Sequence, residues 1–257
     1  MMSLSKKKKY NLGLALSGGG ARGFAHPGAI KAIENAGLKP DLIVGTSAGA
    51  LAGVLYADGY TPEEIINLFS GLEFKKFAEI HLPKAGLFST VGFRRFLKKH
   101  LHAKEFEDLA IPLKVVATNL DAGKVAVFEQ GDLIEAVIAS CSIPIVFEPV
   151  EIKGANYVDG GIFKNFPVSV IREDCNKIIG VNVSPLVPTK YNKTILQIAE
   201  RSYHFMSKNN TLQDRKLCDV LIEIEELITY KTFDIESANK IFNIGYEYGK
   251  KALSGKE

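Results

Sequence analysis

The stretch Asp41-Leu42-Ile43-Val44-Gly45-Thr46-Ser47-Ala48-Gly49 passes from a short apolar run into a cluster of small residues. The apolar run predicts a buried strand over Leu42 to Gly45, and the small and apolar residues that follow predict a helix over Ser47 to Ala57. Because a glycine stands two residues before and two residues after Ser47, the chain can turn sharply from the strand into the helix. Such a turn presents a serine hydroxyl at the edge of a sheet, so Ser47 is a candidate nucleophile.

Strands and helices alternate on both sides of this turn. Tyr10 to Leu16 predicts a buried strand, and Ala25 to Ala36 predicts a helix with Pro27 in its first turn. Further strands are expected at 112–118, 125–128, 147–152, 178–183 and 221–224, and further helices at 61–69, 131–140, 194–208 and 237–253. The alternation predicts an α/β fold of three layers, in which helices cover both faces of a mainly parallel central sheet. We expect one domain over residues 10–257, preceded by a basic tail at residues 1–9.

Composition excludes several classes of function. The chain has 257 residues, of which 46% are hydrophobic, so it can bury a full core, and its net charge of +3 is too small to indicate a nucleic-acid partner. Its three cysteines are widely spaced and form no C-x-x-C pair, so neither a disulfide framework nor a zinc site is expected. The apolar run after Lys6-Lys7-Lys8-Lys9 is too short for a secretion signal, and no stretch is long enough to span a bilayer. We therefore expect a cytoplasmic protein that is soluble or at most peripheral to the membrane.

Two further motifs supply what a serine nucleophile needs. A serine hydroxyl becomes nucleophilic when a base takes its proton, and the oxyanion formed by its attack needs hydrogen-bond donors already in place. The turn Gly18-Gly19-Gly20 lacks Cβ atoms and can direct backbone N–H groups toward one anion, so we assign it to an oxyanion hole. Asp159 lies in a glycine-bounded turn after Tyr157-Val158, where shielding from water would make a carboxylate more basic. Ser47 and Asp159 would then form a catalytic dyad.

The histidines are weaker candidates for the base. His204 gives the chain order Ser, Asp, His that is found in α/β-hydrolases. It lies within a predicted helix, however, and only one strand-helix unit precedes Ser47, where that fold has several strands. We therefore interpret His204 as a residue on a helix face, and we give His26, which lies beside the glycine turn, no more than a minor role in lining the site.

The three motifs, in this order, resemble those of the patatin-like phospholipases, and in particular the short bacterial single-domain members. The likeness covers about Leu12 to Val183. Pro27 departs from the pattern, because many members have an aliphatic residue there. The matching residues are Ser17 to Gly23, Gly45 to Gly49 and Asp159 to Gly161, together with Ile138 to Pro144, Phe147 to Val150 and Asn165 to Val168.

The resemblance implies a patatin fold and the hydrolysis of lipid acyl esters by a phospholipase A or lysophospholipase reaction. It implies Ser47 as nucleophile and Asp159 as base of a Ser-Asp dyad, with an acyl-enzyme intermediate and no metal or other cofactor. The partner would be a lipid acyl-ester substrate, whose identity the resemblance does not fix. The resemblance also implies an oxyanion hole at Gly18, Gly19 and Gly20, anion positioning by Arg22, a nucleophile elbow at Gly45 and Gly49, and the turn of the base at Gly160 and Gly161.

Three other functions stay open. The glycine turn also fits G-x-G-x-x-G at Gly18, Gly20 and Gly23, but Gly45-Thr46-Ser47 stands where a dinucleotide site needs an acidic residue. Thr46 also stands where acyl-carrier-protein acyltransferases, whose fold is related to that of patatins, have a histidine, which disfavours acyl transfer from a thioester. The third alternative is an acyl- or lipid-binding protein of the same fold with little turnover.

The stretch from Phe74 to Leu101 combines apolar and basic residues. The pattern favours a helix that packs on the domain with a solvated basic face. The alternative is a lid, or an element of residues 74–101 that contacts an anionic membrane surface. The residues at helical spacing are the apolar Phe93, Phe96, Leu97 and Leu101 and, between them, the basic Arg94, Arg95, Lys98 and Lys99.

Overall fold

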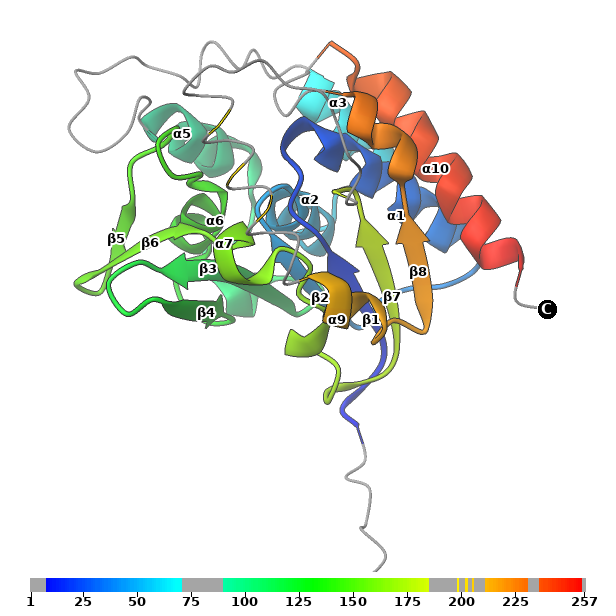
Figure 1. Cartoon of the computed structure of the whole chain (residues 1–257), viewed down its shortest axis with the longest axis horizontal. Helices are drawn as coiled ribbons and strands as arrows, with labels where there is room; N and C mark the ends of the chain where they lie inside the picture. Colours follow the sequence, from blue (N-terminus) through cyan, green and yellow to red (C-terminus); the bar gives the residue numbers. More distant parts are fainter. Residues whose placement is uncertain are drawn as a thin grey trace, which may run out of the picture.

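The computed structural model describes residues 8–70, 90–184, 211–230 and 236–255, and the single residues Ile198, Ser202 and Phe205. Within these residues, one sheet of eight strands forms the centre of the molecule (Figure 1). Its strands are β1 (Tyr10–Leu16), β2 (Leu42–Thr46), β3 (Leu113–Asn119), β4 (Lys124–Phe128), β5 (Val150–Ile152), β6 (Ala155–Asp159), β7 (Cys175–Asn182) and β8 (Val220–Glu223). They follow the order β5-β6-β3-β2-β1-β7-β8, and β4 pairs with β3 beside this path. Strands β3, β2, β1, β7 and β8 run parallel and β4, β5 and β6 join antiparallel, which confirms the predicted mainly parallel sheet.

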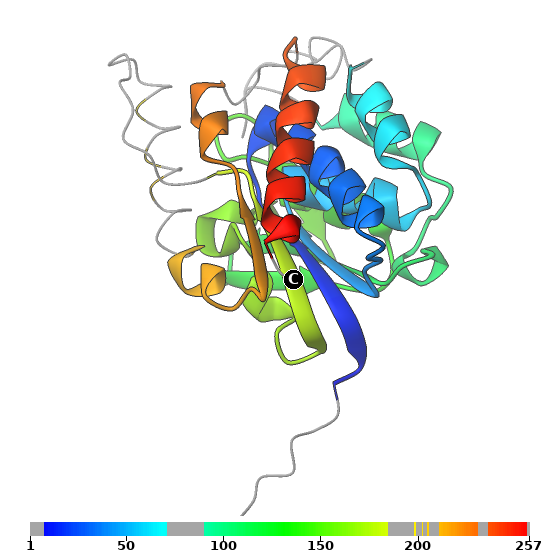
Figure 2. The ribbon, with the colours of Figure 1, turned by 90° about the vertical axis from the view of Figure 1, so that its right-hand side faces the viewer.

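Helices cover both faces of this sheet. On β1, Leu14 and Leu16 belong to a large apolar cluster with side chains of α1, α2, α6 and α10, whereas Ala15 belongs to a smaller cluster with Val168. Neighbouring residues of a strand point to opposite faces, so the two clusters lie on opposite sides of the sheet and the three-layer prediction is confirmed. Figure 2 shows α1 and α10 side by side on the first face. The helices are α1 (Ala25–Asn35), α2 (Ala48–Ala57), α3 (Pro62–Ser70), α5 (Val91–His100), α6 (Leu133–Cys141), α7 (Gly161–Lys164), α9 (Thr211–Arg215) and α10 (Ala238–Ser254), with short 3-10 turns at η1 (Gly20–Phe24), η2 (Phe106–Asp108), η3 (Val168–Val170) and η4 (Glu225–Thr229).

Most predicted elements lie within a few residues of the observed ones. The start of α3 shows the physical reason, because Thr61-Pro62-Glu63-Glu64 forms a capping box there. The Thr61 amide donates to Glu64 Oε2 at 2.8 Å, and the Glu64 amide donates to Thr61 Oγ1 at 3.3 Å. Local hydrogen bonds of this kind fix a helix boundary whatever the rest of the fold does.

Helix α5 has one apolar and one basic face. Phe96 is buried against the core, whereas Arg95, Lys98 and Lys99 are exposed. This is the arrangement of a helix that packs on the domain with a solvated basic face. The rest of the predicted element, residues 74–89, lies outside the described residues, so a lid or a membrane contact there stays a prediction.

The sequence does not predict strand β6, and it predicts a longer β5 than the structure has. The strand expected at 147–152 shortens to Val150–Ile152, and a tight turn at Lys153 and Gly154, with φ of 51° and 79°, leads into β6. Because Ala-Asn-Tyr-Val-Asp has little apolar alternation, β6 carries no clear strand pattern. The helix predicted at 194–208, and His204 within it, lie outside the described residues except for three single positions.

Candidate active site

Ser47 joins the end of β2 to the start of α2 in a strained backbone conformation. Its φ of 53° and ψ of −121° lie in a region that residues other than glycine rarely occupy, at a cost of about 1–3 kcal/mol. The residue is buried, and its carbonyl accepts the Leu51 amide at 3.0 Å in the first turn of α2. The sharp turn that the sequence predicts is therefore present, and strain of this kind is typical of functional sites.

Gly45 and Gly49 make this turn possible by close packing. A Cβ on Gly49 would lie 2.4 Å from the carbonyl oxygen of Leu16, and a Cβ on Gly45 would lie 2.5 Å from the carbonyl oxygen of Gly49. Both distances are shorter than real Cβ atoms tolerate, so both positions require glycine. The first turn of α2 therefore packs directly against the end of β1.

Asp159 approaches the serine turn from the opposite direction. Strand β4 occupies one edge of β3 along residues 115–119, so β2 and β6 must share the other edge. Thr46, the last residue of β2, pairs with Val116, and Asp159, the last residue of β6, pairs with Ala117. The two strands run toward each other along β3 and end at neighbouring positions, which brings the carboxylate turn beside the serine turn.

Asp159 is buried, and its backbone and side chain are both held in place. Its Oδ1 accepts the amide of Gly161 at 2.7 Å, and its own amide donates to the carbonyl of Ser142 at 2.9 Å. Only 1% of its surface is exposed. A Cβ on Gly160 would lie 2.4 Å from the carbonyl oxygen of Val116, so the turn that follows the carboxylate also requires glycine.

The glycine turn lies beside Ser47. A Cβ on Gly18 would lie 3.4 Å from Ser47 Cβ and 2.4 Å from Asn165 Oδ1. The Gly18 amide donates to the Asn165 carbonyl at 2.9 Å, whereas the amides of Gly19 and Gly20 donate no hydrogen bond to the residues that the structure describes. No role for Asn165 is predicted from the sequence, although its position shortly after the Asp159 turn indicates that it lies near the site.

Arg22 lies in η1, the turn that follows these glycines. Its Nε donates to the carbonyl of Tyr230 at 3.1 Å, which ties the turn to the chain at the end of η4. The guanidinium is half-buried and bound at its Nε to this carbonyl, and the anion-positioning role that the family resemblance implies for Arg22 stays a prediction.

The sequence matches the model of a known protein family. The model described as patatin-like phospholipase matches residues 14–171, which is more than half of the 257 residues. The chain belongs to the patatin-like phospholipase family. It is 26% identical to patatin-like phospholipase domain-containing protein 6 of Mus musculus, over 95% of this chain and 20% of that protein. It is 27% identical to lysophospholipase NTE1 of Saccharomyces cerevisiae, over 95% of this chain and 16% of that protein, so it spans a fifth or less of these relatives.

A solved structure shares the fold of this patatin-like chain. The crystal structure of VipD from Legionella pneumophila matches it with a TM-score of 0.59 and 16% sequence identity. The match covers 96% of this chain and 67% of that chain. The mainly parallel sheet with helices on both sides is thus an architecture already seen in a crystal.

The patatin-like chain also buries a histidine beside its glycine turn. His26 is fully buried, its Nε2 lies 2.8 Å from the carbonyl oxygen of Ser17, and its Nδ1 has no partner among the described residues. Burial lowers the pKa of His26 to about 4, and the hydrogen bond to Ser17 opposes this shift only in part. His26 is therefore neutral near pH 7, and Nε2 carries its proton because a carbonyl can only accept. The residue supports the start of the glycine turn.

His26 predicts a loss of stability in mild acid. Below its ordinary pKa of 6.5 the unfolded chain binds a proton on this residue, whereas the folded protein binds it only near pH 4, so the free energy of unfolding falls as the pH drops through this window. The pKa difference corresponds to about 3 kcal/mol at the acid end. We expect His26→Gln to flatten this dependence, measured as urea unfolding midpoints between about pH 7 and pH 4.5. Parallel pH profiles for the two proteins would contradict the prediction.

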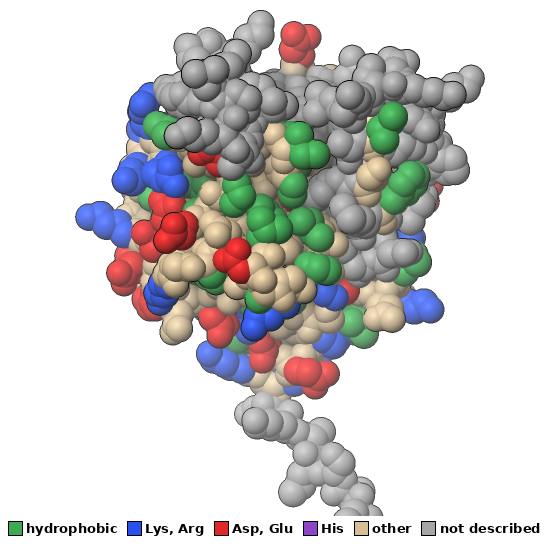
Figure 3. All heavy atoms as spheres, turned by 60° about the vertical axis from the view of Figure 1, so that its left-hand side comes forward, with side chains coloured by type: hydrophobic (Ala, Val, Ile, Leu, Met, Phe, Trp, Pro, Cys, Tyr) green, Lys and Arg blue, Asp and Glu red, His purple; other side chains and the backbone are tan. Residues whose placement is uncertain are grey.

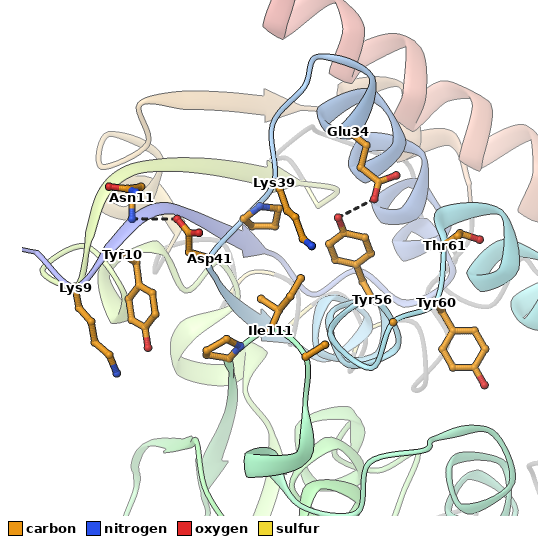
Figure 4. Close-up of a pocket in the computed structure, with 14 residues that line it drawn as sticks. Lys9, Tyr10, Asn11, Glu34, Lys39, Asp41, Tyr56, Tyr60, Thr61 and Ile111 are labelled. Atoms are coloured by element: carbon orange, nitrogen blue, oxygen red, sulfur yellow. Dashed lines mark hydrogen bonds between the residues drawn. The ribbon is translucent and has the colours of Figure 1, made fainter.

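A cavity of about 700 Å³ lies at the opposite end of the strands from Ser47 (Figure 4). Its lining includes Tyr10 at the start of β1 and Asp41 just before β2, so it marks the amino ends of the strands, whereas Ser47 follows the carboxyl end of β2. The Tyr56 hydroxyl in this cavity donates to Glu34 at 2.8 Å. The cavity is therefore separate from the residues that carry the chemical motifs.

Exposed apolar side chains lie close in sequence to the residues that hold the Asp159 turn. Ile145 follows Ser142 by three residues, is 56% exposed and has a φ of 73°. Phe163, in α7, follows Gly161 by two residues and is also exposed. Figure 3 shows hydrophobic side chains gathered on the side of the molecule to which β4, β5, β6 and α7 belong. An apolar surface of this kind suits an apolar ligand.

The described part of the chain contains neither a cluster of metal-binding side chains nor a membrane-spanning helix. No group of three or more His, Cys, Asp or Glu side chains there could hold a metal ion. None of the helices described above is long and apolar enough to cross a membrane.

Proposed function

We propose that the chain hydrolyses acyl esters of lipids, as a phospholipase A or a lysophospholipase, with Ser47 as nucleophile and Asp159 as general base. The observation that carries the proposal is the meeting of β2 and β6 on one edge of β3, which places the strained serine turn beside a buried carboxylate. Membership of the patatin-like phospholipase family supports the same reaction, and the yeast relative is named a lysophospholipase.

The reaction would pass through an acyl-enzyme. Asp159 takes the proton of Ser47 Oγ as this oxygen attacks the ester carbonyl, and a tetrahedral oxyanion forms. When the ester C–O bond breaks, the leaving alcohol takes that proton from Asp159. Asp159 then takes a proton from a water molecule whose oxygen attacks the acyl-Ser47 ester. The fatty acid leaves, and Ser47 Oγ recovers the proton from Asp159.

The amides of Gly19 and Gly20 would bind the oxyanion. These two amides donate to no described residue, whereas the Gly18 amide already donates to Asn165. Gly18 contributes in another way, because the absence of a Cβ lets the turn approach the serine. Arg22 adds positive charge to the same turn, and the first turn of α2 adds the positive end of a helix dipole.

Ile145 and Phe163 would contact the apolar part of the substrate. Both side chains are exposed to water, which is unfavourable, and the positive φ of Ile145 adds strain at a β-branched residue. A lipid acyl chain lying on them would remove apolar surface from water.

A cytoplasmic location and peripheral membrane contact through residues 74–101 are further proposals.

A fluorophosphonate probe tests the nucleophile directly. We expect one covalent adduct on the folded wild-type protein, located on Ser47 by peptide mass spectrometry, together with release of fatty acid from lysophosphatidylcholine. Urea-unfolded protein is the control, because a serine without its base and oxyanion donors does not react. An adduct on another residue contradicts the assignment of Ser47. A folded protein that neither reacts nor hydrolyses would instead favour an acyl-binding function, measured with a fluorescent fatty acid.

A further inference from the structure

Ser140 stands where the two strands of the proposed dyad meet. It lies in the last turn of α6, which packs on β3 and α2, and it is fully buried. Its Oγ accepts the amide of Ser47 at 2.8 Å and donates its own proton to the carbonyl of Val116 at 2.6 Å. One hydroxyl therefore joins the backbone of the serine turn to the backbone of β3.

This hydroxyl takes the place of a strand hydrogen bond. Thr46 pairs with Val116 in the parallel ladder of β2 and β3. In a parallel ladder, every second residue has a carbonyl that accepts the amide of the residue after its partner. The Ile43 amide donates to the Pro112 carbonyl in this way, and the same series assigns the Val116 carbonyl to the amide of Ser47. Ser140 Oγ instead lies between that amide and that carbonyl and bonds to both. The Ser47 amide is therefore linked to β3 through the Ser140 hydroxyl and not directly. Ser47 is also the residue at which the chain leaves the sheet, with a φ of 53°.

The same end of α6 also holds the proposed base. The carbonyl of Ser142 accepts the Asp159 amide at 2.9 Å. The hydroxyl of Ser142 turns back into α6 and donates to the Ile138 carbonyl at 2.8 Å, so it takes no part in this contact. The segment Ser140-Cys141-Ser142 therefore touches the backbone of both members of the dyad, although its residues lie far from each of them in the sequence.

We propose that Ser140 is a positioning residue, whose hydroxyl sets the backbone of Ser47 in the orientation needed for attack. Without this hydroxyl, the buried Ser47 amide and Val116 carbonyl lose their shared partner and stay unpaired. This loss frees the Ser47 backbone and redirects its side chain. The kinetic consequence rests on the proposed function, whereas the structural consequence does not.

Ser140→Ala is the decisive variant. We expect kcat on lysophosphatidylcholine and the rate of fluorophosphonate labelling to fall about a hundredfold, because small displacements of a reacting group have effects of this size. We expect KM to stay within about threefold of the wild type, because Ser140 is buried and does not contact substrate. Ser140→Cys keeps most of the side-chain volume but replaces the hydroxyl by a weak hydrogen-bonding thiol, and it should show the same loss if Ser140→Ala fails to fold.

Cys175→Ala controls for a general loss of core packing. Cys175 is fully buried at the start of β7, next to Tyr10 at the amino end of the sheet. Its truncation removes core contacts far from the serine turn. We expect this variant to lose stability while its kcat stays within about twofold of the wild type.

Amide hydrogen exchange, measured by NMR, gives a readout that does not depend on activity. The Ser47 amide is buried and bonded to Ser140, so its exchange in the wild type is slow. In Ser140→Ala we expect it to exchange at least about tenfold faster relative to the Leu51 amide, which donates to the Ser47 carbonyl and serves as internal reference. Cys175→Ala should leave this ratio unchanged.

The two readouts separate failure of this inference from failure of the proposed function. If the wild type is inert, or if Ser47→Ala keeps its activity, the proposed function fails and the exchange ratio alone decides the role of Ser140. An unchanged exchange ratio in a folded Ser140 variant overturns the inference. With an active wild type, a kcat within about threefold of wild type in Ser140→Ala overturns it as well.

Discussion

Replacing Ser47 with alanine or Asp159 with asparagine is expected to lower kcat/KM by about a thousandfold or more while the protein stays folded. Ser47→Ala removes the oxygen that would carry the acyl group. Asp159→Asn removes the base but keeps a carbonyl oxygen that can still accept the Gly161 amide, so the turn is preserved. Hydrolysis of lysophosphatidylcholine gives kcat/KM, and thermal unfolding verifies the fold of each variant.

Two control variants carry the same substitutions at positions away from the site, so they show whether a loss of activity comes from the position or from the type of substitution. Asp121→Asn changes a carboxylate that accepts the Asn156 amide at 2.8 Å, toward the other end of β6. Ser70→Ala removes a serine hydroxyl at the end of α3. Both should keep kcat/KM within about twofold of the wild type, because neither residue touches the serine turn. Wild-type activity in Asp159→Asn would exclude Asp159 as the base.

Gly49→Ala is expected to destabilise the fold by about 3 kcal/mol or more. The new Cβ would lie 2.4 Å from the carbonyl oxygen of Leu16 and 2.7 Å from that of Ser17. Leu16 pairs with both β2 and β7, so its backbone cannot move away without disturbing the centre of the sheet. Urea unfolding measures the loss, and insoluble expression of this variant alone would be the extreme form of the same result.

Gly53→Ala, in the same helix, is the matched control. Its Cβ would lie 3.1 Å from Ile43 Cγ2, and its other near neighbours at 3.4 and 3.5 Å are also side-chain atoms. Side chains can shift by a few tenths of an ångström, and alanine favours a helix over glycine by about 1 kcal/mol. We therefore expect this variant to stay within about 1 kcal/mol of the wild type. Equal stability of the Gly49 and Gly53 variants would refute the steric argument for the serine turn.

The fold could be predicted from the sequence where an element carries its own local pattern. Strand β1 is rich in apolar residues and ends in the buried run Leu14-Ala15-Leu16, and the capping box at Thr61 marks the start of α3. Strand β6 carries no such pattern, because its extended form depends on pairing with β3 on one side and β5 on the other. Contacts between distant residues decide its structure, and a window of a few residues does not contain them.

The candidate site could likewise be predicted only in part. Ser47 and Asp159 could be selected one by one, because flanking glycines mark the turn on which each lies. Three features of the site could not be predicted: that both residues follow strands on one edge of β3, that the Gly18 amide donates to Asn165, and that the serine turn is bonded to Ser140. Each of these depends on strand register or on a side chain that arrives from another part of the chain.

The shared edge of β3 also makes the geometry of the proposed dyad insensitive to the length of chain between its two members. Strand register sets the separation of Ser47 and Asp159, so residues added between α2 and β3, or between β4 and β6, leave both in place as long as the pairing holds. Under the proposed function, the loops around the site would therefore be free to diverge and to fit other head groups or acyl chains. Such changes would alter the substrate while the relative position of Ser47 and Asp159 stays the same.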